Sequence, residues 1–237
     1  MDIVYTCVVG GYDRLRPDAA STSRSCDDFV CFADAMKSLP SPWRQQSLAR
    51  DLGERERRRT NRWHKLFPHE LFPGARASLY RDGNLELSQN YADYIAAVRD
   101  VDAALGVFRH PRGRSVAEEV LSCREQDKFS PRDLERIDAQ LASYALAGFD
   151  LDTPISANYL LVRNHEHPGL AEAMLLWWEE LERHTGRDQL SLPYVLWKTG
   201  LPFVWLDDRG LPPPQRHPHS GERWRKRWHR LRRWLGT

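Results

Sequence analysis

Ile3-Val-Tyr-Thr-Cys-Val-Val9 is the stretch that decides the fold. It is short, rich in β-branched residues and apolar on both faces, which is typical of a central strand in a sheet covered on both sides. Gly10-Gly11 ends it and permits backbone angles that other residues resist. Phe29-Val-Cys-Phe32 has the same character and is closed by Asp34. The amino-terminal part of the chain therefore predicts two buried strands, each ending in a turn.

The rest of the chain alternates between strand-like and helix-like segments. Further strands are expected at residues 77–81, 104–108, 158–163 and 203–206. Helices are expected within 44–66, from Pro168, at about 189–198, and after the candidate N-caps Ser88, Ser115 and Ser130. This alternation predicts an α/β fold, with a mixed, mostly parallel sheet and helices on both faces.

The composition is that of one ordinary globular domain of 237 residues. The opening residues, MDIVYTCVVG, lack a basic region followed by a long apolar run, so no secretory signal is expected. No segment reaches the roughly 18 apolar residues of a spanning helix. The four cysteines form no CxxC pair and no zinc-type spacing, which favours reduced thiols in a reducing compartment.

Charge is distributed unevenly along the chain. Residues 222–237 carry seven Lys and Arg and one acid, a net +6, while the whole chain is +2, so residues 1–221 are −4. The mildly acidic body argues against a broad nucleic-acid footprint. Residues 1–210 are expected to form the domain, and residues 211–237 a Pro-rich linker and a basic tail helix.

Three predicted strands end in residues suited to binding a ligand. They are followed by Gly10-Gly11, by Asp34 and by Asp82-Gly83-Asn84. In open α/β sheets, ligands bind outside the carboxyl ends of the strands. Asp82 and Asn84 flank a glycine and could direct two oxygen ligands at a hard divalent cation bridging two phosphates. The same three residues also make a good hairpin turn, and the loop alone leaves both interpretations open.

The order of several motifs resembles the TOD/MUCI glycosyltransferase-like family over roughly residues 3–200. Those motifs are Tyr-Thr-Cys-Val-Val-Gly-Gly-Tyr-Asp-Arg-Leu at 5–15, Asp-Phe-Val-Cys-Phe-Ala-Asp at 28–34, Asn-Arg-Trp-His-Lys-Leu-Phe-Pro-His at 61–69, Leu-Tyr-Arg-Asp-Gly-Asn at 79–84, Phe-Arg-His-Pro at 108–111, Trp-Trp-Glu-Glu at 177–180 and Arg-Asp-Gln-Leu-Ser at 187–191. The resemblance implies a GT-A-like nucleotide-diphospho-sugar transferase fold. Plant members are implicated in cell-wall or mucilage polysaccharide synthesis.

The resemblance also implies a donor site and a metal. Asp82 and Asn84 correspond to the Asp-x-Asp metal motif of GT-A enzymes, which holds Mn²⁺ or Mg²⁺, with His219 as a third candidate ligand. Asn84 replaces a carboxylate with a neutral carbonyl oxygen, so metal affinity should be lower. Six further positions would bind the nucleotide and its diphosphate, with the cations offsetting phosphate charge. They are Val9, Gly10 and Gly11 under the nucleotide, Asp34 at the base or ribose, and Arg62 and Lys65 at the diphosphate.

Three residues are candidates for the catalytic role. Asp188-Gln189 resembles a pair found near the sugar in several retaining GT-A families, where a carboxylate binds donor hydroxyls or accepts the acceptor's proton. Asp188 could instead be an acid favoured at a helix N-terminus. Trp178 or Glu179 would face the acceptor, since sugars stack on aromatic rings and bond to carboxylates, while Trp177 fits the inward stripe of its helix.

The basic tail has an amphipathic pattern, with Trp224, Trp228, Leu231 and Leu235 on one stripe among Arg and Lys. It predicts a helix in the interface of an anionic membrane, and hence a cytoplasmic protein bound peripherally to the inner face. Docking of the tryptophans on the protein's own body is an alternative, and nucleic-acid binding, which is not expected, is another.

The family resemblance implies a hexosyltransferase. The donor would be a uridine-linked nucleotide-diphosphate sugar, and the acceptor a surface polysaccharide, lipopolysaccharide or lipid-linked glycan. A nucleotidyltransferase on a similar sheet is a rival, although its Gly-rich loop is usually longer and more basic. A non-catalytic glycan- or membrane-binding module is a second rival.

Overall fold

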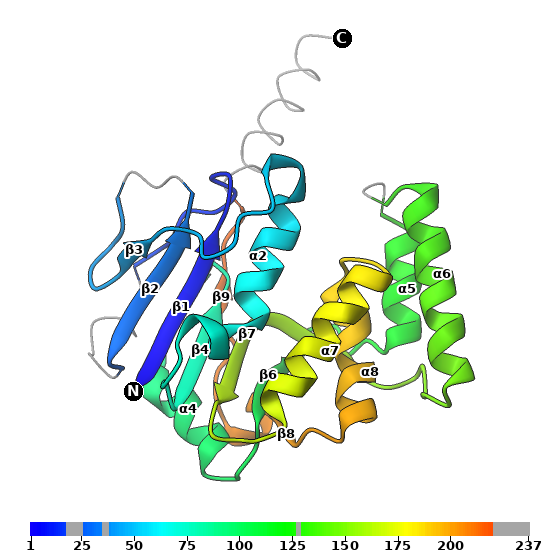
Figure 1. Ribbon diagram of the computed structural model, residues 1–237. Helices are drawn as coiled ribbons and strands as arrows, with labels where there is room; N and C mark the ends of the chain where they lie inside the picture. The colour runs from blue at the N-terminus through cyan, green and yellow to red at the C-terminus, as the bar shows by residue number, and fades with distance from the viewer. Residues whose placement is uncertain (18–25, 35–37, 127–128, 220–237) are drawn as a thin grey trace.

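The computed structural model describes residues 1–17, 26–34, 38–126 and 129–219 (Figure 1). Within them, seven strands form one sheet in the order β3-β2-β1-β4-β7-β6-β8, and two short strands form a second sheet. The seven are β1 (Asp2–Val8), β2 (Asp28–Ala33), β3 (Arg44–Gln46), β4 (Ala77–Arg81), β6 (Leu105–Arg109), β7 (Ser156–Asn164) and β8 (Phe203–Trp205). The two are β5 (Leu85–Glu86) and β9 (Gln215–Arg216).

The large sheet is mixed and mostly parallel, as expected from the sequence. β1 pairs in parallel with β2 and β4, β2 with β3, and β6 with β8. Only β7, among the described strands of this sheet, is antiparallel to both of its neighbours. The carboxyl ends of the six parallel strands therefore meet at one edge, which is the upper edge in Figure 1.

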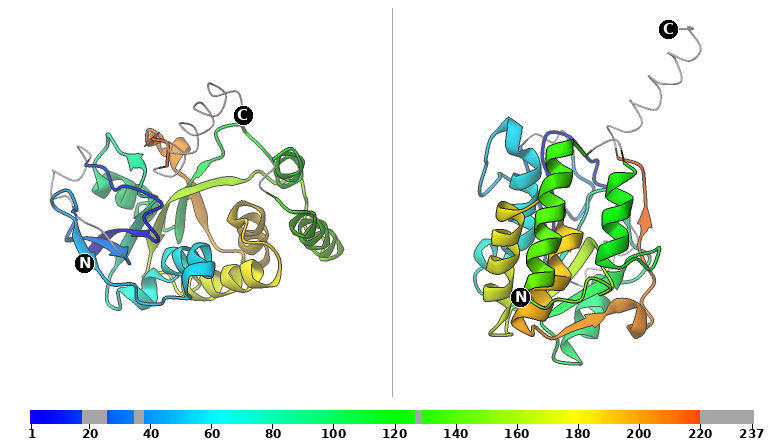
Figure 2. Two further views of the ribbon diagram at one scale, coloured as in Figure 1. Left: turned by 90° about the horizontal axis from the view of Figure 1, so that it is seen from above. Right: turned by 90° about the vertical axis from the view of Figure 1, so that its right-hand side faces the viewer.

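Helices cover both faces of this sheet, again as the alternation predicts. On one face, α2, α3, α7 and α8 pack over β1, β4 and β7, and Trp177 is fully buried there. On the other face, α4 and the short helix η2 pack against Val4, Leu79 and Val162. The view from above in Figure 2 shows α2 and α7 on one side of the sheet and α4 on the other. These helices are α2 (Arg57–Leu66), α3 (Pro68–Leu71), α4 (Tyr91–Arg99), α7 (Leu170–Arg183), α8 (Asp188–Thr199) and η2 (Leu206–Arg209).

A helical pair, α5 (Val116–Arg124) and α6 (Pro131–Leu146), packs beside α8 and has its own apolar cluster. Leu190 of α8 is buried in that cluster. The Tyr144 ring of α6 stacks on the Tyr194 ring of α8, with centroids 3.9 Å apart. Both helices begin with a capping box, which was expected at Ser115, whereas at Ser130 only the start of a helix was expected. The pair holds the N-terminal end of α8 beside the upper edge of the sheet (Figure 1).

Several boundaries differ from those expected. Arg44–Gln46 is an edge strand, and the helix expected within 44–66 begins only at Arg57, after a short turn of helix, η1 (Glu54–Glu56). The cap of α4 is Asn90, which has an extended backbone, and Ser88 lies outside the helix. α7 begins at Leu170, two residues after Pro168. Local composition therefore located the elements better than it located their ends.

The segment 211–219, expected to be a linker, packs on the domain. Its strand β9 pairs with β5, with Leu85 opposite Arg216 and Glu86 opposite Gln215. Among the residues described, no helix has the length and apolar character needed to cross a membrane. The predicted tail helix at 222–237 lies outside the described residues.

Candidate functional site

Three loops converge at the carboxyl edge of the sheet. After β1, the Gly10 N–H donates to Asp34 at the end of β2, with nitrogen to Oδ2 at 2.7 Å. Gly10 and Gly11 both have positive φ, 64° and 61°, which explains why glycine stands there. Gly83, after β4, lies against Asp13, since a Cβ at Gly83 would be 3.1 Å from the Asp13 Cβ. The edge thus brings together the predicted residues Val9, Gly10, Gly11, Asp34 and Asp82-Gly83-Asn84.

A buried ion cluster joins α2 to the N-terminus of α8. Lys65 Nζ donates to Asp188 Oδ2 at 2.8 Å, and Arg62 Nη2 lies 3.3 Å from Asp188 Oδ1. The Lys65 and Asp188 side chains are almost fully buried, and Arg62 is 22% exposed. Burial alone would raise the pKa of Asp188, but Arg62 and Lys65 hold it well below its ordinary value. Asp188 is therefore ionised and committed to two cations.

Tyr80 connects this cluster to Asp82. The Lys65 ammonium lies 5.3 Å from the centroid of the Tyr80 ring, and the Tyr80 hydroxyl donates to Asp82 Oδ1 at 3.0 Å. Burial raises the pKa of Asp82 above its usual value, against the opposing effect of Lys65 and Arg62. Asn61 adds a further link, because its Nδ2 donates to the Cys7 carbonyl at 2.7 Å and so ties α2 to β1.

Asn84 is held by the C-terminal segment. Its Nδ2 donates to the His217 carbonyl at 2.6 Å, and the His217 N–H donates to the Asn84 carbonyl at 3.0 Å. The His217 ring also contacts Glu86, with Nε2 to Oε2 at 2.8 Å. Asn84 Oδ1 is buried and has no hydrogen-bond partner among the residues described. It is a neutral oxygen acceptor left unused, two residues after Asp82.

His219 lies over the loop that follows β1. Its Nδ1 is 2.6 Å from Asp13 Oδ1, and the Tyr12 ring contacts it with centroids 4.6 Å apart. Within residues 1–17, 26–34, 38–126 and 129–219, no three His, Cys, Asp or Glu side chains gather as a metal site. The protein oxygens that fit a hard cation are the Asp82 carboxylate and the unpaired Asn84 Oδ1. Such a set suits Mg²⁺ or Mn²⁺ completed by phosphate oxygens and water.

Gln189 points toward β7. Its Nε2 lies 3.3 Å from the Ser156 carbonyl, and the Ser156 hydroxyl donates to Asn158 Oδ1 at 2.6 Å. Asn158 is buried, and its Nδ2 finds no partner in the part of the chain that the structure describes. An unpaired buried amide is uncommon in folded proteins, and a bound water, ion or catalytic role is among its explanations.

The motif at 177–180 is divided between core and surface. Trp177 is in the core as expected, and its Nε1 donates to the Ser191 hydroxyl at 3.0 Å. Trp178 is also buried, against Phe67, so the expectation that its ring could face a sugar is wrong. Glu179 is exposed in the middle of α7, and no hydrogen bond or ion pair joins it to the cluster among the described residues.

Sequence reasoning missed several residues of this edge. Tyr80 lies two residues before Asp82 on a strand and therefore on the same face, a period-2 signal that was available. Asp13 stands inside the motif at 5–15, next to the predicted glycines, and it too could have been found. Asn158 and the contact of Asn61 with Cys7 depend on which elements pack together, and no local pattern indicates them.

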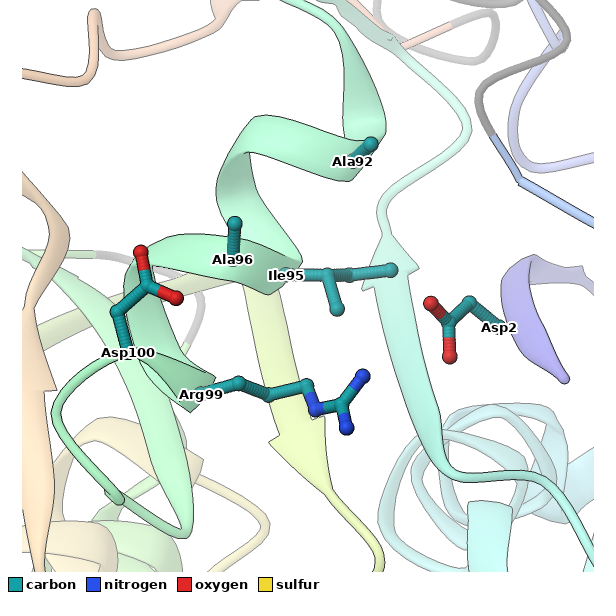
Figure 3. Close-up of a pocket in the computed structure, with 6 residues that line it drawn as sticks. All are labelled: Asp2, Ala92, Ile95, Ala96, Arg99 and Asp100. Carbon is teal, nitrogen blue, oxygen red and sulfur yellow. The ribbon is translucent and has the colours of Figure 1, made fainter.

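A shallow depression of about 370 Å³ lies at the opposite edge of the sheet (Figure 3). None of the candidate site residues lies on it, and it is lined by α4 and by the first residue of β1. Its lining residues are Asp2, Ala92, Ile95, Ala96, Arg99 and Asp100.

Comparison with known proteins finds glycosyltransferases among curated sequences and among solved structures. A curated relative, the probable hexosyltransferase MUCI70 of Arabidopsis thaliana, is 27% identical over 154 residues, covering 62% of this chain and 26% of the relative. The chain thus spans about a quarter of that relative's length. Among solved structures, the apo bifunctional glycosyltransferase WbbM has a TM-score of 0.49 at 10% identity, covering 85% of this chain and 38% of its own. Apo mouse xyloside xylosyltransferase 1 has a TM-score of 0.44 at 9% identity. That match covers 86% of this chain and 85% of the xylosyltransferase chain.

Residues 41–204 match the model of the TOD1/MUCI70 glycosyltransferase-like domain. This range is more than half of the chain and includes α2, the Asp82-Gly83-Asn84 loop and the N-terminus of α8. The chain belongs to the TOD1/MUCI70 family of glycosyltransferase-like domains.

Proposed function

We propose that this chain is a hexosyltransferase that uses a nucleotide-diphosphate sugar, with uridine as the base. The acceptor would be a surface polysaccharide, a lipopolysaccharide or a lipid-linked glycan. One observation carries the proposal: the ion cluster of Asp188, Lys65 and Arg62 meets the Asp82-Gly83-Asn84 loop at the carboxyl edge of the sheet, in a glycosyltransferase-like domain. That edge is where α/β sheets bind nucleotide ligands.

The charges of the edge support a divalent cation as cofactor. The two cations Arg62 and Lys65 stand against three acids, Asp13, Asp82 and Asp188, before a diphosphate enters. A diphosphate brought there would need further positive charge. Asp82 and Asn84 Oδ1 would hold Mn²⁺ or Mg²⁺, with His219 as the third candidate. The cation would neutralise charge on the leaving diphosphate as the bond from the sugar carbon to the phosphate oxygen breaks.

The surroundings of Asp188 favour one of the two roles considered for it. A carboxylate whose pKa is held low by two cations is a weak proton acceptor. We therefore assign Asp188 to orienting Lys65 and Arg62 and to accepting hydrogen bonds from donor hydroxyls, with Gln189 beside it. Glu179 would act only on an acceptor that reaches across α7.

The membrane part of the proposal rests on sequence. Residues 222–237 would lie on an anionic membrane and place the enzyme at its cytoplasmic face, near a lipid-linked acceptor. Deleting residues 222–237 should release the protein from vesicles containing anionic lipid without changing its thermal unfolding. Equal vesicle binding by the truncated chain would remove this part of the proposal.

A binding and turnover experiment tests the transferase proposal. Wild-type protein should be stabilised by uridine diphosphate more strongly with Mn²⁺ than without, and should release uridine diphosphate from uridine-diphosphate hexoses. Asp82→Asn should lower that turnover by roughly 100-fold or more, whereas Asp100→Asn, an exposed control, should not. Pyrophosphate release from a nucleoside triphosphate and a sugar phosphate would identify a nucleotidyltransferase instead. No stabilisation by any nucleotide would indicate a non-catalytic module.

A further inference from the structure

Lys65 and Arg62, the two cations nearest Asp188, are outnumbered by the acids around them. Both Asp188 oxygens are bound, one by Lys65 and one by Arg62. With the Asp82 and Asp13 carboxylates, three acids stand against these two cations. A diphosphate therefore needs a cationic side chain whose charge is not already matched by a buried acid.

Arg57, the first residue of α2, lies directly against Gly10. A Cβ added to Gly10 would be 2.8 Å from the Cδ, the Nε and the Nη1 of Arg57. The end of the arginine side chain therefore occupies the space that any side chain at position 10 would fill. Glycine at this position serves two purposes: it permits the positive φ, and it admits Arg57 to the turn after β1.

The charge of Arg57 is only weakly matched. Its one ion pair among the described residues is with Glu54 at 3.3 Å, and the Glu54 side chain is 90% exposed. Exposed pairs of this kind are weak and are screened by salt. The Arg57 side chain is itself 48% exposed, so a ligand can reach it.

The position of Arg57 is fixed by the helix below it. Asn61 lies one turn further along α2 and is bonded to the Cys7 carbonyl of β1, and Lys65 lies one turn beyond Asn61. Arg57, Asn61 and Lys65 thus share the helix face that meets the carboxyl end of β1. A planar guanidinium on that face can bind two phosphate oxygens at once.

We infer that Arg57 binds the diphosphate of the nucleotide ligand across the Gly10-Gly11 turn. The inference rests on the proposed function, because it takes a nucleoside diphosphate to be the ligand of this edge. It assigns the phosphate contact to a residue outside the buried cluster. Arg62 and Lys65 then serve mainly to hold Asp188.

Calorimetric titration with uridine diphosphate and with uridine, both with Mn²⁺ present, tests this assignment. Arg57→Gln should weaken uridine diphosphate binding about tenfold or more and leave uridine binding unchanged. Arg55→Gln removes the same charge two residues earlier and serves as the matched control, with wild-type affinity expected.

Two glycine variants test the contact with Gly10. Gly10→Ala and Gly11→Ala both force alanine to a positive φ, but only Gly10→Ala displaces Arg57, because a Cβ at Gly11 meets nothing within 4 Å. Gly10→Ala should weaken uridine diphosphate binding more than Gly11→Ala does. Combining Gly10→Ala with Arg57→Gln should add little further loss.

The outcomes separate the two proposals. If wild-type protein binds uridine diphosphate and Arg57→Gln binds it equally well, the assignment of Arg57 is overturned and the proposed function stands. If wild-type protein binds neither compound, the proposed function fails and this inference fails with it.

Discussion

Arg187 and Asp188 are consecutive in the chain, yet different helices bind their charged side chains. Arg187 Nε donates to Glu119 of α5 at 3.0 Å, while Asp188 accepts from Lys65 of α2 at 2.8 Å. The two networks meet at the N-terminus of α8, so the helical pair α5–α6 and the central helix α2 are connected through one peptide unit.

Glu119 is the anchor of the first network, and replacing it should destabilise the fold. Its side chain is fully buried and binds both Arg187 and Arg114, the latter at 2.8 Å. Glu119→Gln would leave two guanidinium groups without a matching charge, at a cost of about 3 kcal/mol in the free energy of unfolding. Denaturant titration measures this change in the free energy of unfolding. The control is Glu125→Gln, because Glu125 is exposed at the end of the same helix. If Glu119→Gln lowers the free energy of unfolding no more than Glu125→Gln does, the Glu119 carboxylate is not what stabilises Arg114 and Arg187.

The Lys65–Asp188 pair should show strong coupling in a double-mutant cycle. Lys65→Met leaves the buried Asp188 with Arg62 alone, and Asp188→Asn leaves two cations without their acid. We expect the two changes together to cost about 2 kcal/mol less than the sum of the single changes. Denaturant unfolding at pH 7 gives the change in the free energy of unfolding for each single variant and for the double variant. Strict additivity would contradict a direct interaction.

Gly106 of β6 should not tolerate a methyl group. A Cβ there would overlap Val98 Cγ2 of α4 and lie 3.0 Å from Leu206 Cδ2. Gly106→Ala should therefore destabilise the protein by roughly 1–3 kcal/mol through overpacking. Adding Val98→Ala should relieve part of the overlap and recover some of the loss, whereas a double variant less stable than Gly106→Ala would argue against this contact.

Stability should fall as the solution is acidified from pH 6.5 toward pH 3, partly because of His165. Burial, and then the neighbouring Arg163 and His69, lower its pKa to about 3. The unfolded chain binds a proton there near pH 6.5, so between these pH values the unfolded state holds more protons and gains stability. His165→Gln, which can keep the contact with Ser78, should flatten the decline between pH 6.5 and pH 4. Unfolding free energies measured across that range check the slope, and parallel curves would exclude His165 as the source.

If Asp82 and Asn84 hold a cation, a second carboxylate should strengthen the site. Asn84→Asp restores a charged ligand and should raise Mn²⁺ affinity about tenfold or more. It also removes the donor to the His217 carbonyl, so Asn84→Ala is the control for that loss. Mn²⁺ titration followed by thermal unfolding measures both variants. Equal affinity in wild type and Asn84→Asp would place the cation elsewhere.

The sheet could be predicted because its strands carry their own signals. Ile3 to Val9 is apolar on both faces, and Ser115 and Ser130 form complete capping boxes. β3 at Arg44–Gln46 could not be predicted from the sequence. Its three residues are polar and exposed and have no strand-like pattern, and they form a strand because they pair with β2. Tertiary pairing decided that edge, as it often does for short strands.

The site could be predicted only as a set of loops. Asp82, Asn84, Lys65 and Asp188 were identified from motifs, but nothing local indicates that Lys65 and Asp188, 123 residues apart, share a hydrogen bond. The same holds for Asn84, whose partner His217 arrives from the end of the described chain. Long-range contacts follow from strand order, which a single sequence constrains weakly.

The pairing of β9 with β5 has a practical consequence for handling the protein. Because His217 and His219 are bound to Glu86 and Asp13, the described part of the chain ends beside the carboxyl edge of the sheet. Met1 lies at the far edge of the sheet (Figure 1). Affinity tags, fluorophores and surface-immobilisation handles therefore belong on the amino-terminal side, away from the proposed nucleotide site.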